Sequence, residues 1–479
     1  MEPPSARRQI IFNAFDMFTP SHLCFGQWRR GQGEVADKFG DLNYWTNLAQ
    51  ILERGDIHAL ILADTYGQHD IYNGSAVPTI RTSCQFPMGD PIIPVTAMAA
   101  VTKKLGFIVT TSTSYEAPFV IAKRFSTLDH LTKGRFGWNI VTSFKESAAK
   151  AVILFGIMPN IHQVGISYVE HDERYAAADE YLELLYKIWE GSWADDALKK
   201  DATKNIHADP SRIRWVKHHT ARFSVDAPHI LHPSPQRTPF LLQAGTSSAG
   251  IAFAAKHAEG IMISGLSPHI LAPRVSAIRE QAAAAGRDPG SVKIFAVITP
   301  VIGRTDEEAG AKYRKAMEYA SFEAGLAFFS GNAGIDLAKY DLDAEIRPDD
   351  ATIDGRVHSL VSSLKYRGDD IPAWTPRNIG KAMAIGGNGP VPVGSAARVA
   401  DFLEEWVKIA DLDGFNVGHV TSPGSSEDLV DLLVPELRRR GLYGYNRQSG
   451  DEITLRERMY GVGQKHFRND HVGSQYKYK

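Results

Sequence analysis

Eight short runs rich in Ile, Val and Phe alternate along the chain with longer stretches of helical periodicity. Strands buried on both faces read as continuous apolar runs, and their alternation with helices is typical of a parallel sheet. Eight such units favour a closed barrel over an open sheet. We therefore predict an α/β fold, a (β/α)8 TIM barrel, with strands at residues 9–15, 58–63, 106–111, 136–141, 239–244, 260–264, 293–301 and 414–420.

The helical patterns occupy the intervals between these runs, at residues 44–54, 94–104, 117–130, 172–190, 248–257, 268–285, 306–329, 395–410 and 427–440. Barrels with insertions reach 479 residues as one domain. We predict a single domain over residues 1–479, with insertions at about 194–238 and 331–394 and an additional tail after Gly441. Because inserted segments often build the mouth of a barrel, we expect these stretches to border the active site.

Composition excludes several classes of function. The net charge is −2 and 23% of residues are charged, so no concentrated basic surface is available for nucleic acid or an anionic membrane. Only two cysteines occur, which excludes a disulfide framework and a cysteine-based zinc site. The chain has no apolar run of about 18 residues, and residues 1–8 lack the apolar segment of a secretion signal. We expect a cytoplasmic protein.

Polar residues at the ends of the apolar runs are the first candidates for a site, because barrel enzymes react at the carboxyl ends of their strands. Asp64 follows the second run, Thr110 ends the third, and Asn139 lies inside the fourth among aromatic and β-branched residues. A buried amide needs hydrogen-bond partners, and a ligand could supply them to Asn139. Asp64 could act as a base, bind sugar hydroxyls or cap the next segment, and the sequence does not separate these roles.

A small-residue loop at 245–250, Gly-Thr-Ser-Ser-Ala-Gly, joins the fifth strand to a helix. Such a loop lets backbone N–H groups approach an anion, and Ser247 and Ser248 add hydroxyl groups. The alternative is an ordinary helix cap by Thr246 or Ser247. His171 and Tyr175, at the start of another helix, could reach the same anion, although this acidic first turn also suits the helix dipole.

Several common motifs are missing from the sequence. There is no dinucleotide-binding fingerprint, Walker loop, nucleophile elbow or metal-binding His-Glu-x-x-His pattern, and we expect no metal site. A barrel with a phosphate-binding loop but no strong acid, nucleophile or metal suggests that an organic cofactor carries the chemistry.

Nine ordered motifs extend this interpretation. They are Asn-Ala-Phe-Asp-Met at 13–17, Leu-Asn-Tyr-Trp-Thr at 42–46, Leu-Ala-Asp at 62–64, Ser-Thr-Leu-Asp-His-Leu-Thr-Lys-Gly-Arg at 126–135, Trp-Asn-Ile-Val-Thr-Ser at 138–143, Glu-His-Asp-Glu-Arg-Tyr at 170–175, Ser-Pro-Gln-Arg-Thr-Pro at 234–239, Gln-Ala-Gly at 243–245 and Val-Pro-Glu-Leu at 434–437. Together they strongly resemble the bacterial-luciferase-like flavin monooxygenases. The resemblance covers nearly the whole chain and is to the group with long-chain alkane, dibenzothiophene sulfone and nitrilotriacetate monooxygenases.

This resemblance implies FMN bound without a covalent link at the barrel mouth, delivered as FMNH2 by a separate NAD(P)H:FMN reductase. Dioxygen would add to the reduced flavin to give a C4a-peroxyflavin, which would oxygenate a small organic substrate of the alkane, sulfone or amine-acid type. The family also implies a homodimer or homotetramer. It does not identify a catalytic side chain.

The resemblance further implies cofactor roles for seven residues. Around the isoalloxazine and ribityl it places Asp64, Thr110 and Asn139. Around the phosphate it places His171, Tyr175, Ser247 and Ser248.

Three departures from the family pattern concern the substrate side. Thr19 stands where the alkane-oxidising relatives carry Cys, Phe144 stands where they carry His, and an apolar stretch at about 151–164 replaces a shorter connection. Alkane specificity is therefore in doubt. A deazaflavin-dependent oxidoreductase and a non-catalytic flavin-binding protein on the same barrel are the alternatives. A metal-free hydrolase is disfavoured, because no carboxylate pair lies at the strand ends.

Overall fold

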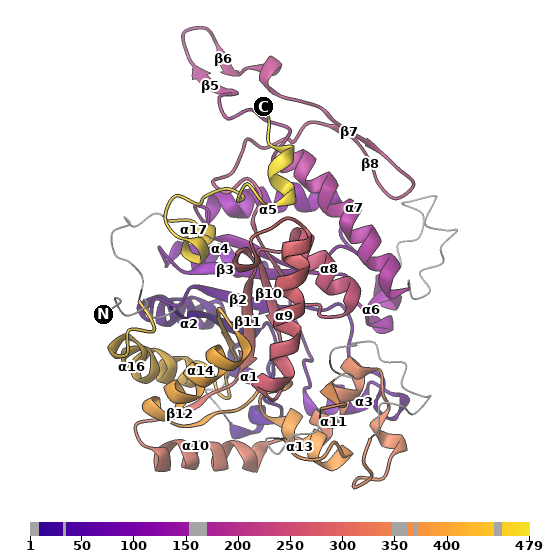
Figure 1. The fold of residues 1–479 in the computed structure, drawn as a ribbon, viewed down its shortest axis with the longest axis vertical. Helices are drawn as coiled ribbons and strands as arrows, with labels where there is room; N and C mark the ends of the chain where they lie inside the picture. The colour runs from indigo at the N-terminus through magenta and orange to yellow at the C-terminus, as the bar shows by residue number, and fades with distance from the viewer. Residues whose placement is uncertain are drawn as a thin grey trace.

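The computed structural model describes residues 9–31, 35–152, 170–346, 360, 363–366, 371–444 and 453–479. Eight parallel strands close into a barrel in the order β1-β14-β11-β10-β9-β4-β3-β2. Figure 1 shows helices around the central strands. This confirms the predicted fold class and all eight predicted strands. The strands are β1 (Ile11–Met17), β2 (Ala59–Ala63), β3 (Gly106–Ser112), β4 (Phe136–Val141), β9 (Phe240–Gln243), β10 (Gly260–Ile263), β11 (Lys293–Ile298) and β14 (Gly414–Val417).

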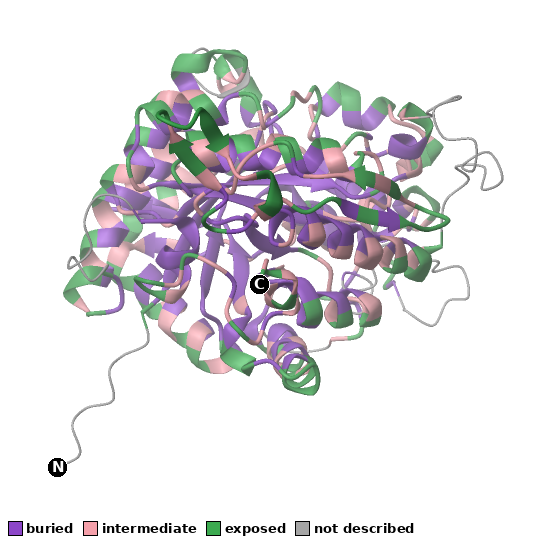
Figure 2. Cartoon of the chain, turned by 90° about the horizontal axis from the view of Figure 1, so that it is seen from above, coloured by how far each residue is buried: buried purple, intermediate pink, exposed green. Residues whose placement is uncertain are grey.

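Neighbouring residues of several barrel strands belong to different hydrophobic cores, since side chains alternate between the two faces of a strand. The inner core contains Ile11, Ile61, Ile108, Phe240 and Phe295. The outer core, between strands and helices, contains Phe12, Leu60, Phe107, Leu241 and Ile294. Figure 2 shows the result: buried strands at the centre and helices whose outer faces are exposed. Continuous apolar strand sequences are thus explained by burial on both faces.

The helices that surround the barrel start and end near the predicted positions. They are α2 (Leu42–Arg54), α4 (Val95–Ala100), α5 (Pro118–Leu131), α7 (His171–Trp189), α8 (Ser248–His257), α9 (Pro268–Ala284) and α14 (Ala396–Ala410). The last predicted helix is a continuous run of α15 (Gly424–Asp428), a π-helical turn at Leu429–Leu433 and α16 (Val434–Arg439).

Two of the predicted elements each form two separate elements in the structure. The helix predicted at 306–329 is wrong: α10 (Asp306–Tyr319) ends and α11 (Phe322–Ala333) begins after Ser321, whose hydroxyl accepts from the Ala324 N–H at 3.3 Å. The strand predicted at 293–301 ends at Ile298. Pro300 cannot donate to a strand ladder, and the following β12 (Val301–Gly303) pairs outside the barrel with β13 (Val393–Ser395).

Segments between the barrel units extend in two directions. The hairpins β5–β6 (Leu198–Asp201, Ile206–Ala208) and β7–β8 (Val216–His219, Ser224–Ala227) project beyond the helices beside the C-terminus (Figure 1). At the other end of the view, α11 packs against α13 (Pro376–Ala384) and α3 (Val77–Thr82). Among the described residues, no helix has the length and apolar character needed to cross a membrane.

The C-terminal tail closes the amino end of the barrel. Leu455, the first residue of α17 (Leu455–Tyr460), is fully buried in the inner core, and a Cβ added at Gly106 or Gly137 would touch its side chain. Arg456 is also fully buried, with its Nε 2.6 Å from Oε1 of Glu259, just before β10. The expectation that the tail borders the pocket is therefore wrong for residues 455–460, because they fill the opposite end of the barrel.

Candidate active site

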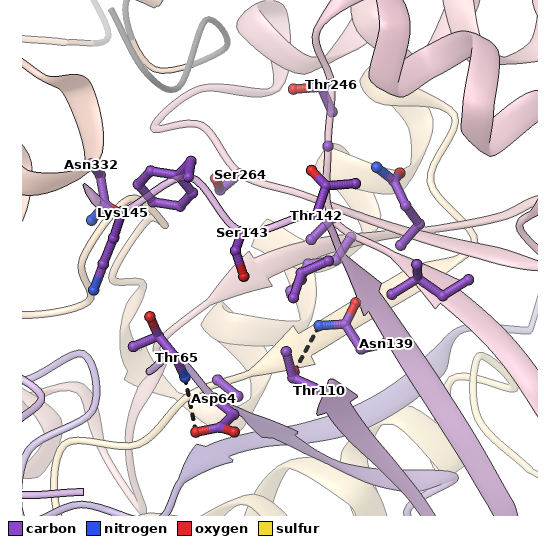
Figure 3. A pocket seen from close by; sticks show the side chains of 18 of the residues that line it. Asp64, Thr65, Thr110, Asn139, Thr142, Ser143, Lys145, Thr246, Ser264 and Asn332 are labelled. Carbon is purple, nitrogen blue, oxygen red and sulfur yellow. Dashed lines mark hydrogen bonds between the residues drawn. The ribbon is translucent and has the colours of Figure 1, made fainter. Parts of the chain in front are cut away.

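A cavity of about 340 Å³ lies at the carboxyl ends of the barrel strands. Its lining includes Asp64 after β2, Thr110 of β3, Asn139 of β4 and Gln243 at the end of β9 (Figure 3). His171, Tyr175 and Ser247 complete its outer side. Six of the seven candidate residues from the sequence thus line one cavity. Ser248 is the exception: it is exposed and is not part of the lining.

Asn139 and Thr110 form the polar floor of this cavity. They lie opposite each other on adjacent strands, and the Asn139 Nδ2 group donates to the Thr110 Oγ1 at 2.8 Å (Figure 3). The Asn139 Oδ1 atom is buried with no hydrogen-bond partner, and so is the Gln243 Oε1 atom. Buried polar atoms are normally satisfied, so two unpaired oxygens at one cavity are consistent with a ligand that donates hydrogen bonds.

The outer side combines a helix start with hydroxyl groups. Ser247 caps α8 by accepting from the Gly250 N–H at 3.1 Å, and its Oγ lies 3.0 Å from His171 Nε2. The helix cap at Ser247 is therefore observed, and the anion site stays a prediction for the same residue. A Cβ at Gly245 would lie 2.2 Å from the Tyr175 hydroxyl. Glycine at this position lets the loop backbone approach Tyr175 closely.

Arg174 adds a positive charge that the sequence reasoning missed. It lies next to Tyr175 in the first turn of α7, is buried and lines the cavity. An arginine in the lining of the cavity that also contains Tyr175 and Ser247 favours an anion there. Its position inside the Glu-His-Asp-Glu-Arg-Tyr motif was the signal that could have identified it.

Asp64 is the carboxylate of this cavity. Burial, with smaller contributions from the carboxylates of Asp90 and Glu116, raises its pKa to about 7, although the Thr65 N–H donates to Oδ1 at 2.8 Å. A group with this pKa can hold or release a proton near neutral pH. Asp64 can therefore act as either donor or acceptor toward a bound ligand.

A second polar cluster consists of Asp16, His22 and His419, of which His22 lines the cavity. Asp16 is in β1 and His419 follows the adjacent β14, and the Asp16 Oδ1 and His419 Nε2 atoms are 2.9 Å apart. One ligand atom from each of the three residues lies within 4.8 Å of the others. Burial lowers the pKa of His22 to about 4. Such a cluster can move a proton or bind a cation, so the absence of a metal site stays a prediction.

The sequence reasoning missed this cluster because 403 residues separate Asp16 from His419. Their signal was the position of both residues at the ends of strands that are the first and last of the barrel. Only a closed barrel makes those strands neighbours.

Lys145 was also missed. It is buried, follows β4 and lines the cavity, with Nζ 3.1 Å from the Gly67 carbonyl oxygen. Burial lowers its pKa to about 8.

The inserted segments contribute unequally to the cavity. No described residue of 194–238 lines it, so that part of the expectation is wrong: these hairpins lie on the outside of the barrel. Asn332 and Asn388, within 331–394, do line it. Most of the apolar stretch at about 151–164 lies outside the described residues.

The two residues that replace the alkane-type pattern differ in position. Phe144 lines the cavity. Thr19 is buried and donates from Oγ1 to the Pro87 carbonyl oxygen at 2.7 Å, and it is not part of the lining.

Known proteins match the chain over nearly its whole length. The dimethyl-sulfide monooxygenase of Hyphomicrobium sulfonivorans is 42% identical over 472 residues, which cover 98% of this chain and 94% of the relative. The long-chain alkane monooxygenase of Geobacillus thermodenitrificans is 41% identical over 470 residues, 98% of both chains. A crystal structure of long-chain alkane monooxygenase superimposes with a TM-score of 0.85 at 40% identity, covering 98% of this chain and 99% of that one.

A third relative was crystallised with a flavin. The structure of riboflavin lyase with modified FMN and riboflavin superimposes with a TM-score of 0.84 at 33% identity, covering 98% of this chain and all of the other, 100%. Residues 19–412 match the family model described as luciferase-like monooxygenase. The resemblance found in the nine motifs is confirmed, and these relatives include dimethyl-sulfide, long-chain alkane, dibenzothiophene-sulfone and nitrilotriacetate monooxygenases. The chain belongs to the luciferase-like monooxygenase family.

Proposed function

We propose that this protein is a two-component monooxygenase that takes FMNH2 from a separate NAD(P)H:FMN reductase and uses O2 to oxygenate a small organic substrate. The observation that carries the proposal is the convergence of Asn139, Tyr175 and Ser247 on one cavity at the carboxyl ends of the strands. Family membership supports an oxygenase, and the FMN-containing relative supports this particular cofactor.

The residues present fit FMN. The unpaired oxygens of Asn139 and Gln243 are acceptors that match the ring N–H and ribityl hydroxyl donors of a flavin. Arg174, Tyr175, Ser247 and His171 offer charge and hydrogen bonds to its phosphate. We place Ser248 at the phosphate only through its backbone N–H, because its side chain is exposed.

Reduced flavin, when bound, supplies the electrons that activate O2. The chain supplies binding, orientation and exclusion of water. Its cavity has apolar walls from residues such as Phe15, Met262 and Phe328, which keep bulk water away from the reacting atoms. Asp64, with a pKa of about 7, can hold or release a proton at the same cavity near neutral pH. We further propose a single domain and a homodimer or homotetramer that works in the cytoplasm.

Rapid mixing tests this function. The purified protein, loaded with photoreduced FMN, is mixed with oxygenated buffer while flavin absorbance is recorded. We expect reoxidation far slower than that of free FMN, through a spectrum that differs from both reduced and oxidised flavin. In steady state, O2 consumption should require NADH and a flavin reductase.

Reoxidation at the rate of free FMN would contradict the proposal. Hydride transfer from a reduced deazaflavin without O2 consumption would instead support the oxidoreductase alternative. Tight flavin binding with neither activity would support a non-catalytic flavin-binding protein.

A further inference from the structure

Lys145 places a positive charge inside the cavity, away from the proposed phosphate end. Its side chain comes from the loop after β4, and the residue is only 8% exposed. In Figure 3, Lys145 and Asn332 lie on one side of the pocket, while Asn139 and Thr246 lie on the other. A flavin phosphate held by Ser247 therefore does not account for this ammonium group.

The hydrogen bonds around Lys145 leave part of its donor capacity unused. An ammonium has three N–H donors, and the Gly67 carbonyl accepts one at 3.1 Å. The other close atom is His69 Nε2, at 3.4 Å. That nitrogen also lies 3.1 Å from the Gln85 Oε1 atom.

The orientation of Gln85 decides which nitrogen of His69 carries the proton. The Gln85 Nε2 group donates to the His22 carbonyl oxygen at 3.0 Å, so its Oε1 atom faces His69 as an acceptor. His69 Nε2 must then be protonated to donate to Gln85. It cannot also accept from Lys145, which is left with two N–H groups that no described protein atom accepts.

The charge of Lys145 is also uncompensated at short range. Asp70 and Asp64 act on it only through space, and no carboxylate among the described residues forms an ion pair with it. A buried cation is costly unless an anion or several acceptors surround it. The lining also includes the apolar side chains of Phe144 and Phe328, which offer no charge to balance that of Lys145.

We propose that Lys145 binds the anionic group, a carboxylate, of a substrate whose remaining body is apolar. The inference rests on the proposed function, because it assumes that substrate and flavin share this cavity. An apolar body fits the walls formed by Phe144, Phe328 and Met262. The carboxylate accepts hydrogen bonds from the two remaining N–H groups of Lys145. The substrates of this protein are then organic acids and not uncharged alkanes.

Calorimetry with a matched pair of probes tests this assignment. Hexanoate and hexanamide have nearly the same size and apolar chain and differ in charge. Both are titrated into the FMN-loaded protein, in which the flavin phosphate fills the proposed phosphate end, in a buffer free of other small anions that bind ammonium groups. We expect hexanoate to bind on the order of tenfold more tightly, or better, because charge-assisted hydrogen bonds exceed neutral ones.

Two substitutions and a control complete the experiment. Lys145→Met should abolish the preference for hexanoate and leave hexanamide binding nearly unchanged, and Lys145→Arg should restore most of the preference. Lys150→Met is the control, because Lys150 lies in α6 (Glu146–Ala151), the helix that begins after Lys145, and its side chain is 68% exposed. That variant should bind both probes like the wild type.

Equal affinity of the wild type for both probes, or an unchanged preference in Lys145→Met, would overturn the assignment. If Lys145→Met does not fold, Lys145→Gln is measured in its place. Loss of the preference for hexanoate in that variant supports the assignment, and persistence of the preference overturns it. Repeating the titration on flavin-free protein separates this inference from the proposed function. Failure to bind FMN would contradict the function, while the preference for hexanoate can still be measured.

Discussion

Tyr175 shows how much of the site depends on single side chains. Its hydroxyl lies within 3.5 Å of Gln243 Nε2 and next to the loop backbone at Gly245. Removing one hydrogen bond to a charged group costs about 1.5–3 kcal/mol, which corresponds to roughly 10- to 100-fold in Kd. We predict that Tyr175→Phe weakens FMN binding by this factor, measured by quenching of flavin fluorescence.

Tyr443→Phe is the matched control for this substitution. The Tyr443 hydroxyl donates to the Asp56 carbonyl oxygen at 2.6 Å, and Tyr443 does not line the cavity. Its loss should reduce stability but leave the FMN affinity unchanged. Equal FMN affinities in Tyr175→Phe and wild type would remove Tyr175 from the proposed phosphate site.

Asp64 gives a prediction about pH. Its folded pKa of about 7 exceeds the ordinary value of 3.8 mainly through burial. The folded state then binds more protons than the unfolded state, so stability falls as the pH rises from about 4 to about 7 and is constant above. Asp64→Asn removes this cost and should raise the free energy of unfolding above pH 7 by roughly 2 kcal/mol, allowing for partial solvent contact.

Urea unfolding of both proteins without flavin, across this pH range, measures the difference. It should be small at the acid end and grow toward neutral pH. A difference that is the same at all pH values would show that the Asp64 carboxyl titrates normally.

At the scale of elements, the pattern of apolar runs was sufficient to predict the barrel strands, because a strand buried on both faces is a continuous apolar run in the sequence. The division between α10 and α11 has no comparable sequence pattern. Residues around Ser321 keep helical composition, and the helix ends there because the Ser321 hydroxyl takes the place of a backbone acceptor. Local capping of this kind depends on backbone direction, which tertiary packing sets.

The cap gives an element-scale prediction. Ser321→Ala should lower the free energy of unfolding by about 1 kcal/mol, since it leaves N–H groups of the first turn of α11 without that acceptor. Ser276→Ala, at an exposed position inside α9, is the control and should change stability by less than about 0.5 kcal/mol. Thermal unfolding of both variants measures the effect. Equal stabilities would mean that packing alone ends α10.

The candidate site could be predicted in part for a related reason. Asp64 and Thr110 were selected because they lie at strand ends, where barrel geometry brings residues together, and Asn139 because a polar amide stands among apolar strand residues. Lys145 and the pairing of Asp16 with His419 could not be found from strand ends alone. Their relevance depends on side-chain direction and on contacts between distant segments, and neither has a sequence period.

At the scale of the whole molecule, the two ends of the barrel have different tasks. The carboxyl end holds the cavity, and the amino end is closed by α17. Several family motifs belong to this closed end: Asp129 accepts from the Gln236 backbone N–H at 2.9 Å, and the Gln236 Oε1 atom accepts from the Arg456 N–H at 3.1 Å. A motif shared with relatives therefore does not by itself mark a residue of the site.

Substitution of Arg456 tests whether the closed end of the barrel contributes to stability and not to FMN binding. Besides Glu259, it donates to the carbonyl oxygens of Thr238, at 2.9 Å, and of Pro239, at 3.1 Å. Arg456→Met leaves the buried Glu259 carboxylate unpaired and should lower the free energy of unfolding by about 3–5 kcal/mol. Arg439→Met, whose side chain is 71% exposed, should change it by less than about 1 kcal/mol.

The double substitution Arg456→Met with Glu259→Leu distinguishes the loss of an ion pair from the loss of packing. It should recover part of the stability, because no buried charge then lacks a partner. Urea unfolding measures stability, and flavin fluorescence measures FMN affinity in the folded fraction of each variant. If α17 closes only the amino end, FMN affinity stays at the wild-type value while stability falls. A parallel fall in FMN affinity would show that the closed end also positions the cavity, and the two ends would then have to be treated as one coupled unit.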